Sequence, residues 1–241
     1  MSSTIVLFVD YYNLSVNLRK TGSVSISKVV LDIVEENIRQ DYRRVLVRFY
    51  GGWYIKNILT IDAQRLSAEI SAEFPVAHVM NSNKMIVDCE LALTLRSDMK
   101  RHIWHTMRKH RMPTGLFSLG QEDIGCDKGN CIASSFKKLL ETGVCPIEGC
   151  TTKVNQILGK DEQKLVDAMI ASDMIHCMIT GEKEIVLVSS DDDFFPAIQL
   201  LVQNGVKLIQ VNTKRRNRDP RDYYPDLPDN YLITNIYRRS T

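Results

Sequence analysis

Five aspartates in this chain stand where they could assemble a metal site. In chain order they are Asp10, Asp167, Asp173, Asp191 and Asp193. The first closes the apolar run at 5–9, and the last two follow the run at 185–189. Short apolar runs bounded by polar residues are typical of buried parallel strands, whose carboxyl ends collect the ligands of open α/β sheets. Carboxylates that share such an edge repel one another, so a hard divalent cation is their natural partner.

Asp167 and Asp173 have different expected roles because they are six residues apart on one predicted helix. That separation is a rotation of about 600°, which places the two side chains on different faces. We therefore predict that Asp167 is a direct ligand and that Asp173 supports the site or faces the substrate. A competing interpretation is that Asp191 or Asp193 only caps the next helix, although one cap does not require several acids. Asp88, in a similar block upstream, is a weaker candidate ligand.

A second set of potential ligands consists of cysteines in two C-x4-C pairs. These are Cys126, Cys131, Cys145 and Cys150. Four thiolates suit tetrahedral Zn²⁺, and a closed site of this kind is structural because it leaves no open coordination position. The spacing of four is wider than the usual two, so free thiols, disulfides and redox chemistry remain alternatives.

Basic residues occur in two local groups, although 31 lysines and arginines nearly balance 29 acidic residues overall. Nucleic-acid affinity would therefore depend on these groups rather than on net charge. The candidate contacts are Arg101, Trp104, Arg108, Lys109 and Arg111, followed by Lys214, Arg215, Arg216 and Arg218. Basic side chains offset phosphate charge, and a tryptophan can stack on a base. The alternative is that both groups are solvated loops, with Trp104 tucked into the core.

The elements expected around these residues alternate strand and helix. Strands at 5–9, 45–50 and 76–80 are separated by helices that we predict at about 27–38, capped by Ser27, and at 61–73. This βαβαβ order predicts a parallel sheet with right-handed crossovers.

The rest of the chain shows other patterns. Apolar and polar residues alternate from Val87 to Leu95, which predicts a strand with one wet face, on an edge or in a hairpin. We expect one α/β domain over residues 1–241, with an insertion at 97–155 that carries the basic arm and the cysteines. Residues 213–241 are expected to be a basic tail, with a strand or docked segment near 231–236.

Three blocks of the chain resemble the NYN branch of the PIN-like nucleases, the family that includes the LabA-type proteins. The blocks run from Phe8 to Leu14, from Lys164 to Asp173 and from Val188 to Pro196. The resemblance implies a Rossmann-like parallel sheet sandwiched by helices, with Mg²⁺ or Mn²⁺ in an acidic pocket that acts on RNA.

Site residues carry over from the family by position. The implied catalytic metal ligands are Asp10, Asp167, Asp191 and Asp193, supported by Asn13, Asp173 and Ser189. The chain departs from the family pattern at Leu165 and Ser190, where glycine is commoner, and in its four-cysteine insertion.

The function we expect is that of a metal-dependent endoribonuclease, in which a metal-activated water attacks the phosphodiester bond. One alternative is a weakly active RNA- or nucleotide-binding regulator. Another is a protein that docks a partner, or a second copy of itself, through the zinc insertion. The chain has no apolar run of about 18 residues and starts without a charged leader, so we expect a cytoplasmic protein without a membrane anchor.

Overall fold

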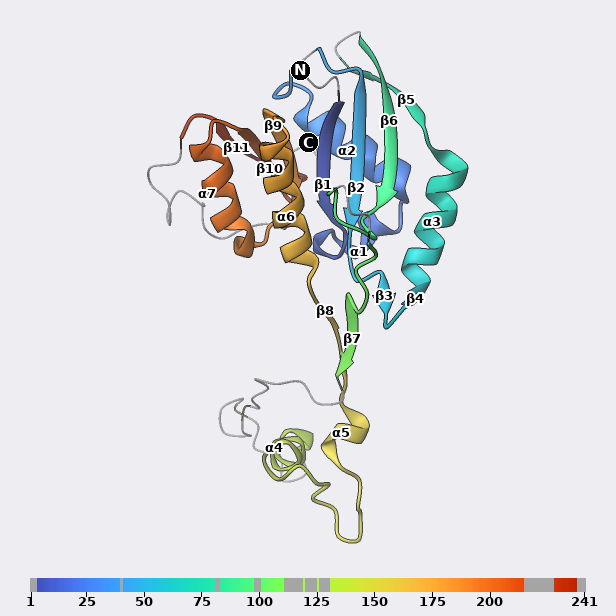
Figure 1. Ribbon diagram of the computed structural model, residues 1–241. Helices are drawn as coiled ribbons and strands as arrows, with labels where there is room; N and C mark the ends of the chain where they lie inside the picture. The colour runs from blue at the N-terminus through green and yellow to red at the C-terminus, as the bar shows by residue number, and fades with distance from the viewer. Residues whose placement is uncertain are drawn as a thin grey trace. The chain divides into compact units, whose positions relative to one another are not determined.

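The computed structural model describes residues 4–39, 41–80, 83–97, 101–110, 119, 125, 131–214 and 228–237 (Figure 1). Within them the chain divides into two compact units. The first contains residues 1–106 and 163–241, and the second contains residues 107–162.

A seven-stranded sheet forms the centre of the first unit, in the order β11-β10-β9-β1-β2-β6-β5. The strands are β1 (Thr4–Asp10), β2 (Arg44–Tyr50), β5 (Val76–Met80), β6 (Asn83–Leu91), β9 (Glu184–Val188), β10 (Lys207–Asn212) and β11 (Tyr231–Asn235). All neighbouring pairs are parallel except β5 and β6. A mixed α/β fold is therefore confirmed.

Helices cover both faces of this sheet, as Figure 1 shows. They are α2 (Ser23–Val34) and α3 (Ile61–Glu73) on one face, and α6 (Val166–Ile179) and α7 (Phe195–Gln203) on the other. A single turn, α1 (Val16–Arg19), precedes α2, and the short hairpin β3 (Tyr54–Ile55) and β4 (Ile58–Leu59) precedes α3.

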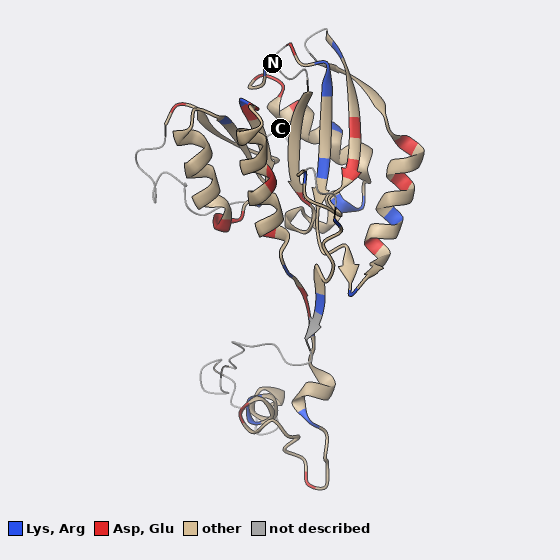
Figure 2. Ribbon diagram, in the orientation of Figure 1, with Lys and Arg blue, Asp and Glu red and all other residues tan. Residues whose placement is uncertain are grey.

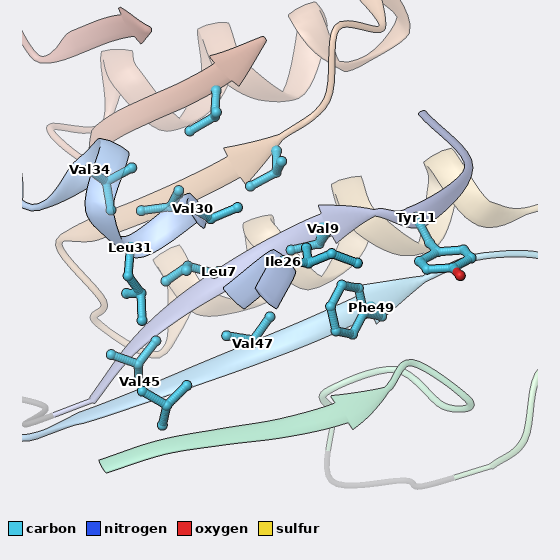
Figure 3. Close-up of a cluster of buried hydrophobic side chains, with 14 of the residues drawn as sticks. Leu7, Val9, Tyr11, Ile26, Val30, Leu31, Val34, Val45, Val47 and Phe49 are labelled. Atoms are coloured by element: carbon cyan, nitrogen blue, oxygen red, sulfur yellow. The ribbon is translucent and has the colours of Figure 1, made fainter. Parts of the chain in front are cut away.

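The side chains of β1 point alternately to the two faces of the sheet, which explains why both faces need a layer of helices. Leu7 and Val9 pack with α2 and α3, whereas Phe8 packs with α6 and α7. Figure 3 shows the first of these cores, in which Ile26 and Val30 of α2 lie over the strands. Successive strand side chains point to opposite faces, so a strand that is apolar throughout must be covered twice.

One prediction about the sheet edges was wrong, and another was right about the hairpin but not about where the strand begins. Residues 76–80 do form a strand, but it is antiparallel to β6 and lies at the edge. β5 ends at Met80 and β6 begins at Asn83, and this interval cannot hold the crossover that a parallel connection requires. The strand predicted from Val87 begins four residues earlier, at Asn83, and lies in a hairpin, as expected, but not at the edge.

Two other elements differ from their predicted extent. Ser27 does not cap the first long helix, because α2 already begins at Ser23 and the Ser27 hydroxyl bonds to the Ser23 carbonyl oxygen within it. Part of the predicted basic tail is β11, which pairs with β10 and completes the sheet. The strand expected near 231–236 is thereby confirmed.

The second unit contains α4 (Ile132–Thr142) and α5 (Val154–Ile157), with β7 (Met107–His110) at its start and β8 (Lys160–Gln163) at its end. Its bounds, 107–162, differ from the insertion predicted at 97–155. Residues 101–106 belong instead to the sheet unit, where Ile103 N–H donates to the Leu93 carbonyl oxygen. Among the described helices, none has the length and apolar character needed to cross a bilayer.

The sheet unit should fold without residues 107–162, because its two chain ends already meet. Lys164 N–H donates to the Thr106 carbonyl oxygen at 2.9 Å, so a short Gly-Ser turn can replace the second unit without stretching either end. We expect the shortened protein to show cooperative thermal unfolding by circular dichroism. A shortened protein without a cooperative transition would show that the sheet depends on the second unit.

Candidate metal centre

The topology of the sheet brings the ends of β1 and β9 together. β1 pairs with β2 on one side and with β9 on the other, and the chain adds later strands in opposite directions from this point. In open α/β sheets, ligands bind outside the carboxyl ends of the strands where this reversal occurs. Asp10 ends β1, and Ser189 follows β9 at the same edge, which we call the carboxyl edge.

Three carboxylates converge at the carboxyl edge. Asp167 lies in the first turn of α6, Asp191 precedes the 3-10 turn at 192–194, and Asp193 lies within that turn. One ligand oxygen from each lies within 4.8 Å of the others. In Figure 2 the acidic residues at the starts of α6 and α7 appear in red. Among the described residues, no other group of three or more potential ligands meets this criterion.

This donor set fits a hard divalent cation. Mg²⁺ binds oxygen at about 2.1 Å, so oxygens on opposite sides of one ion lie about 4.2 Å apart. Small side-chain rotations would bring the three oxygens into that range. Asp167 and Asp193 are exposed and Asp191 is partly exposed, so water and substrate can reach the same place. Mg²⁺ commonly keeps water ligands in just such partial sites.

Asp10 lies beside this group rather than within it. Its side chain is buried, with 5% of its surface exposed, and its carboxylate accepts a hydrogen bond from the Ser189 hydroxyl at 3.1 Å. Burial, and then the negative charge of Asp167, raise the pKa of Asp10 to about 6. Burial and the charges of Asp191 and Asp193 also raise the pKa of Asp167. A bound cation would relieve both the burial of negative charge and the repulsion between these carboxylates.

A chain of hydrogen bonds connects Asp10 to the exposed acids. The Ser189 hydroxyl donates to Asp10 and accepts from the Asp191 backbone N–H at 3.1 Å. The Asp191 carboxylate in turn accepts from the Asp193 backbone N–H at 3.0 Å. Ser189 is fully buried, so its predicted supporting role corresponds to holding the turn that carries both acids.

A second network holds the same turn from the side of β10. The Asn13 side-chain oxygen accepts from Ser190 N–H and from the Thr213 hydroxyl. The Ser190 hydroxyl accepts from the backbone N–H groups of Thr213 and Lys214, at 2.8 and 2.9 Å. The sequence marks Ser190 as a departure from the glycine of the family, and Thr213 was missed because nothing in its sequence context indicates a partner so distant.

Leu165, the other departure from glycine, has a left-handed backbone. Its φ is 69° immediately before α6, two residues from Asp167. A residue with a Cβ atom is strained there by about 1–2 kcal/mol, whereas glycine is not. The start of α6, which carries Asp167, is therefore held in a conformation that leucine does not favour.

Asp173 does not join the acidic group. It is buried on α6, where its carboxylate accepts from the Tyr50 hydroxyl and from Arg96 N–H, both at 2.7 Å. The Arg48 guanidinium lies 3.3 Å from the same carboxylate. The six-residue spacing correctly separated Asp173 from Asp167, but the partners of Asp173 fix α6 to β2, so its role is structural.

The four-cysteine zinc site stays a prediction, because the structure describes only three of its members. Cys126 lies outside the described residues. Cys131, Cys145 and Cys150 are partly exposed, and their sulfur atoms do not together form a compact group of three. Cys145 and Cys150 do interact, and hydrogen bonding with Thr152 and then with Cys145 lowers the pKa of Cys150. A low thiol pKa favours the thiolate that a metal would bind.

The predicted nucleic-acid contacts fall into two classes. Arg101, Trp104, Arg108 and Lys214 are exposed, and Lys214 also donates its backbone N–H to Ser190 beside the acids. Arg111, Arg215, Arg216 and Arg218 lie outside the described residues, as does the side chain of Lys109. Trp104 is not tucked into the core.

Comparison with models of protein families, with curated proteins and with solved structures finds no match for this chain. The functional argument therefore depends on the geometry of the site.

Replacing Asp10 with asparagine should stabilise the metal-free protein above pH 6. The folded-state pKa is raised from 3.8 to about 6, so wild-type stability falls as the pH rises through this interval. A shift of this size corresponds to about 3 kcal/mol, which Asp10→Asn would recover because the amide does not ionise. The measurement is urea unfolding in EDTA across this pH range.

The exposed Asp161 provides the control, because Asp161→Asn should leave the pH dependence unchanged. If wild type and Asp10→Asn had the same free energy of unfolding at all pH values, ionised Asp10 would not destabilise the folded protein.

Proposed function

We propose that this chain is a metal-dependent endoribonuclease of the NYN/PIN-like type, which hydrolyses phosphodiester bonds in RNA. The observation that carries the proposal is the convergence of Asp167, Asp191 and Asp193 within 4.8 Å at the switch point of a parallel sheet. These acids come from two segments separated by β9, so local sequence alone does not bring them together. The choice of RNA follows from the family resemblance.

The carboxylates of Asp167, Asp191 and Asp193 would hold Mg²⁺ or Mn²⁺. Such an ion would lower the pKa of a bound water and offset the charge that develops on the phosphoryl group. Asp10 acts as a positioning residue, because it reaches Asp191 only through the Ser189 hydroxyl. Asn13 and Ser190 hold the turn at 190–193 against the end of β10.

A basic residue is fixed beside the acids. Lys214 follows β10 at the carboxyl edge, its side chain is exposed, and its backbone is anchored to the Ser190 hydroxyl at 2.9 Å. A phosphodiester that approaches three carboxylates is repelled, and a cation at the rim offsets part of that repulsion. Cleavage would leave a 5′-phosphate and a 3′-hydroxyl, as the resemblance implies.

A second function, the docking of a protein partner, is favoured by apolar side chains exposed on the 107–162 unit. Ile132 is 83% exposed and Ile147 is 69% exposed, and Phe136 adds an exposed ring on α4. This function is compatible with cleavage by the sheet unit.

End-labelled single-stranded RNA should be cut in Mg²⁺ or Mn²⁺ but not in EDTA. The double variant Asp191→Asn, Asp193→Asn should lose at least about 100-fold in rate, a loss typical of removing groups that stabilise charge in the transition state. Asp192→Asn is the matched control, because Asp192 stands between the two acids but outside the converging group.

Two results would contradict the proposal. One is RNA cleavage that the double variant retains, which would place the activity elsewhere or in a contaminant. The other is RNA binding by pure protein without cleavage in either metal, which would favour a binding regulator instead.

A further inference from the structure

An exposed aromatic stack lies in the sheet unit, at the segment that follows the β6 strand. The rings of Trp104 and His102 are stacked, with centroids 5.0 Å apart and planes inclined by 13°. Tyr54 supports both, since its ring meets Trp104 edge-on at 4.6 Å and its hydroxyl lies 2.8 Å from His102 Nδ1.

Trp104 is exposed to solvent, which is unlike the other tryptophan of the chain. Of its surface, 43% is exposed, whereas Trp53, the other tryptophan of the chain, is fully buried. Its contacts with Tyr54 and His102 fix the ring before any ligand arrives. A prepositioned, exposed aromatic ring is the arrangement on which bases of single strands stack.

The stack is anchored to the segment that carries Asp167. The Thr106 hydroxyl, which is buried, accepts from Tyr54 N–H at 2.9 Å. The Thr106 carbonyl oxygen accepts from Lys164 N–H, also at 2.9 Å, three residues before Asp167. Tyr54 itself follows the carboxyl end of β2, so the stack and the acids belong to the same edge of the sheet.

Cationic and titratable groups adjoin the stack. Arg101 is exposed next to His102 in the sequence. Lys56 and His105 are also exposed, and the His105 N–H donates to the Lys56 carbonyl oxygen at 2.9 Å. A polynucleotide presents bases and phosphates in alternation, so an aromatic face beside cations matches both.

We propose that Trp104 is a stacking site for an unpaired base of single-stranded RNA, with Arg101 and Lys56 placed to contact the adjoining phosphates. This inference deepens the proposed ribonuclease function and rests on it for the choice of RNA. It specifies an unpaired substrate, because bases inside a duplex do not offer a free face to Trp104.

The test measures binding in EDTA, where cleavage does not interfere. A fluorescein-labelled oligouridine and an RNA duplex of the same length are titrated by anisotropy with wild type, Trp104→Ala and Trp104→Phe. We expect Trp104→Ala to weaken oligouridine binding by about fivefold or more, while Trp104→Phe, which keeps an aromatic face, stays near wild type. Duplex binding should be the same for all three proteins.

Two controls separate stacking from loss of structure. Phe136→Ala removes an aromatic ring that is similarly exposed, at 41%, in the other unit, and should leave oligouridine binding unchanged. Unlabelled oligouridine should quench the tryptophan fluorescence of wild type but not that of Trp104→Phe, in which only the buried Trp53 remains.

Wild-type protein that does not bind oligouridine, or oligouridine binding unchanged in Trp104→Ala, would overturn the inference. Cleavage assays with metal separate this failure from failure of the proposed function. If binding depends on Trp104 but no RNA is cut, the stacking site stands and the nuclease function fails. If RNA is cut but oligouridine binding does not depend on Trp104, the nuclease function stands and the stacking site fails.

Discussion

The parallel pairing of β1 with β9 is the constraint on which the site depends. These strands are separated by more than 170 residues in the chain, and their register, Val9 opposite Val188, places Asp10 beside Ser189. The hydrogen-bond chain from Asp10 to Asp193 follows from this contact. The Ser189 hydroxyl can bridge Asp10 and the Asp191 backbone only because both strands end at the same level.

The same contact concentrates negative charge, and this charge lowers the free energy of unfolding of the metal-free protein. Burial and the charge of Asp167 raise the pKa of Asp10, and Asp167 is itself perturbed by Asp191 and Asp193. Leu165 adds backbone strain beside them. Backbone strain and perturbed charges that occur together at one place are typical of functional sites, where stability is exchanged for reactivity. A bound cation would relieve the electrostatic part.

Much of this arrangement could be predicted from the sequence because its signals are local. The bounds predicted for α3 and β5 match the structure, and the apolar runs located β1 and β9. The antiparallel β5 was not predicted because the next strand was expected to begin only at Val87, which concealed how short the interval between β5 and β6 is. The partners of Asp173 were not predicted because they are distant in the chain. The Ser190 and Thr213 contacts were missed for the same reason, since a hydroxyl gives no sign in sequence of which distant amide it will meet.

The most direct test of the central claim, that Asp167 and Asp191 serve one cation, is a double-mutant cycle on Mn²⁺ affinity measured by titration calorimetry. The account predicts that Asp167→Asn and Asp191→Asn each weaken Mn²⁺ binding, and that the double variant loses much less than the sum of the two losses, since both remove ligands of one ion. Wild-type protein that does not bind Mn²⁺, or single variants that bind it as tightly as wild type, would contradict the account.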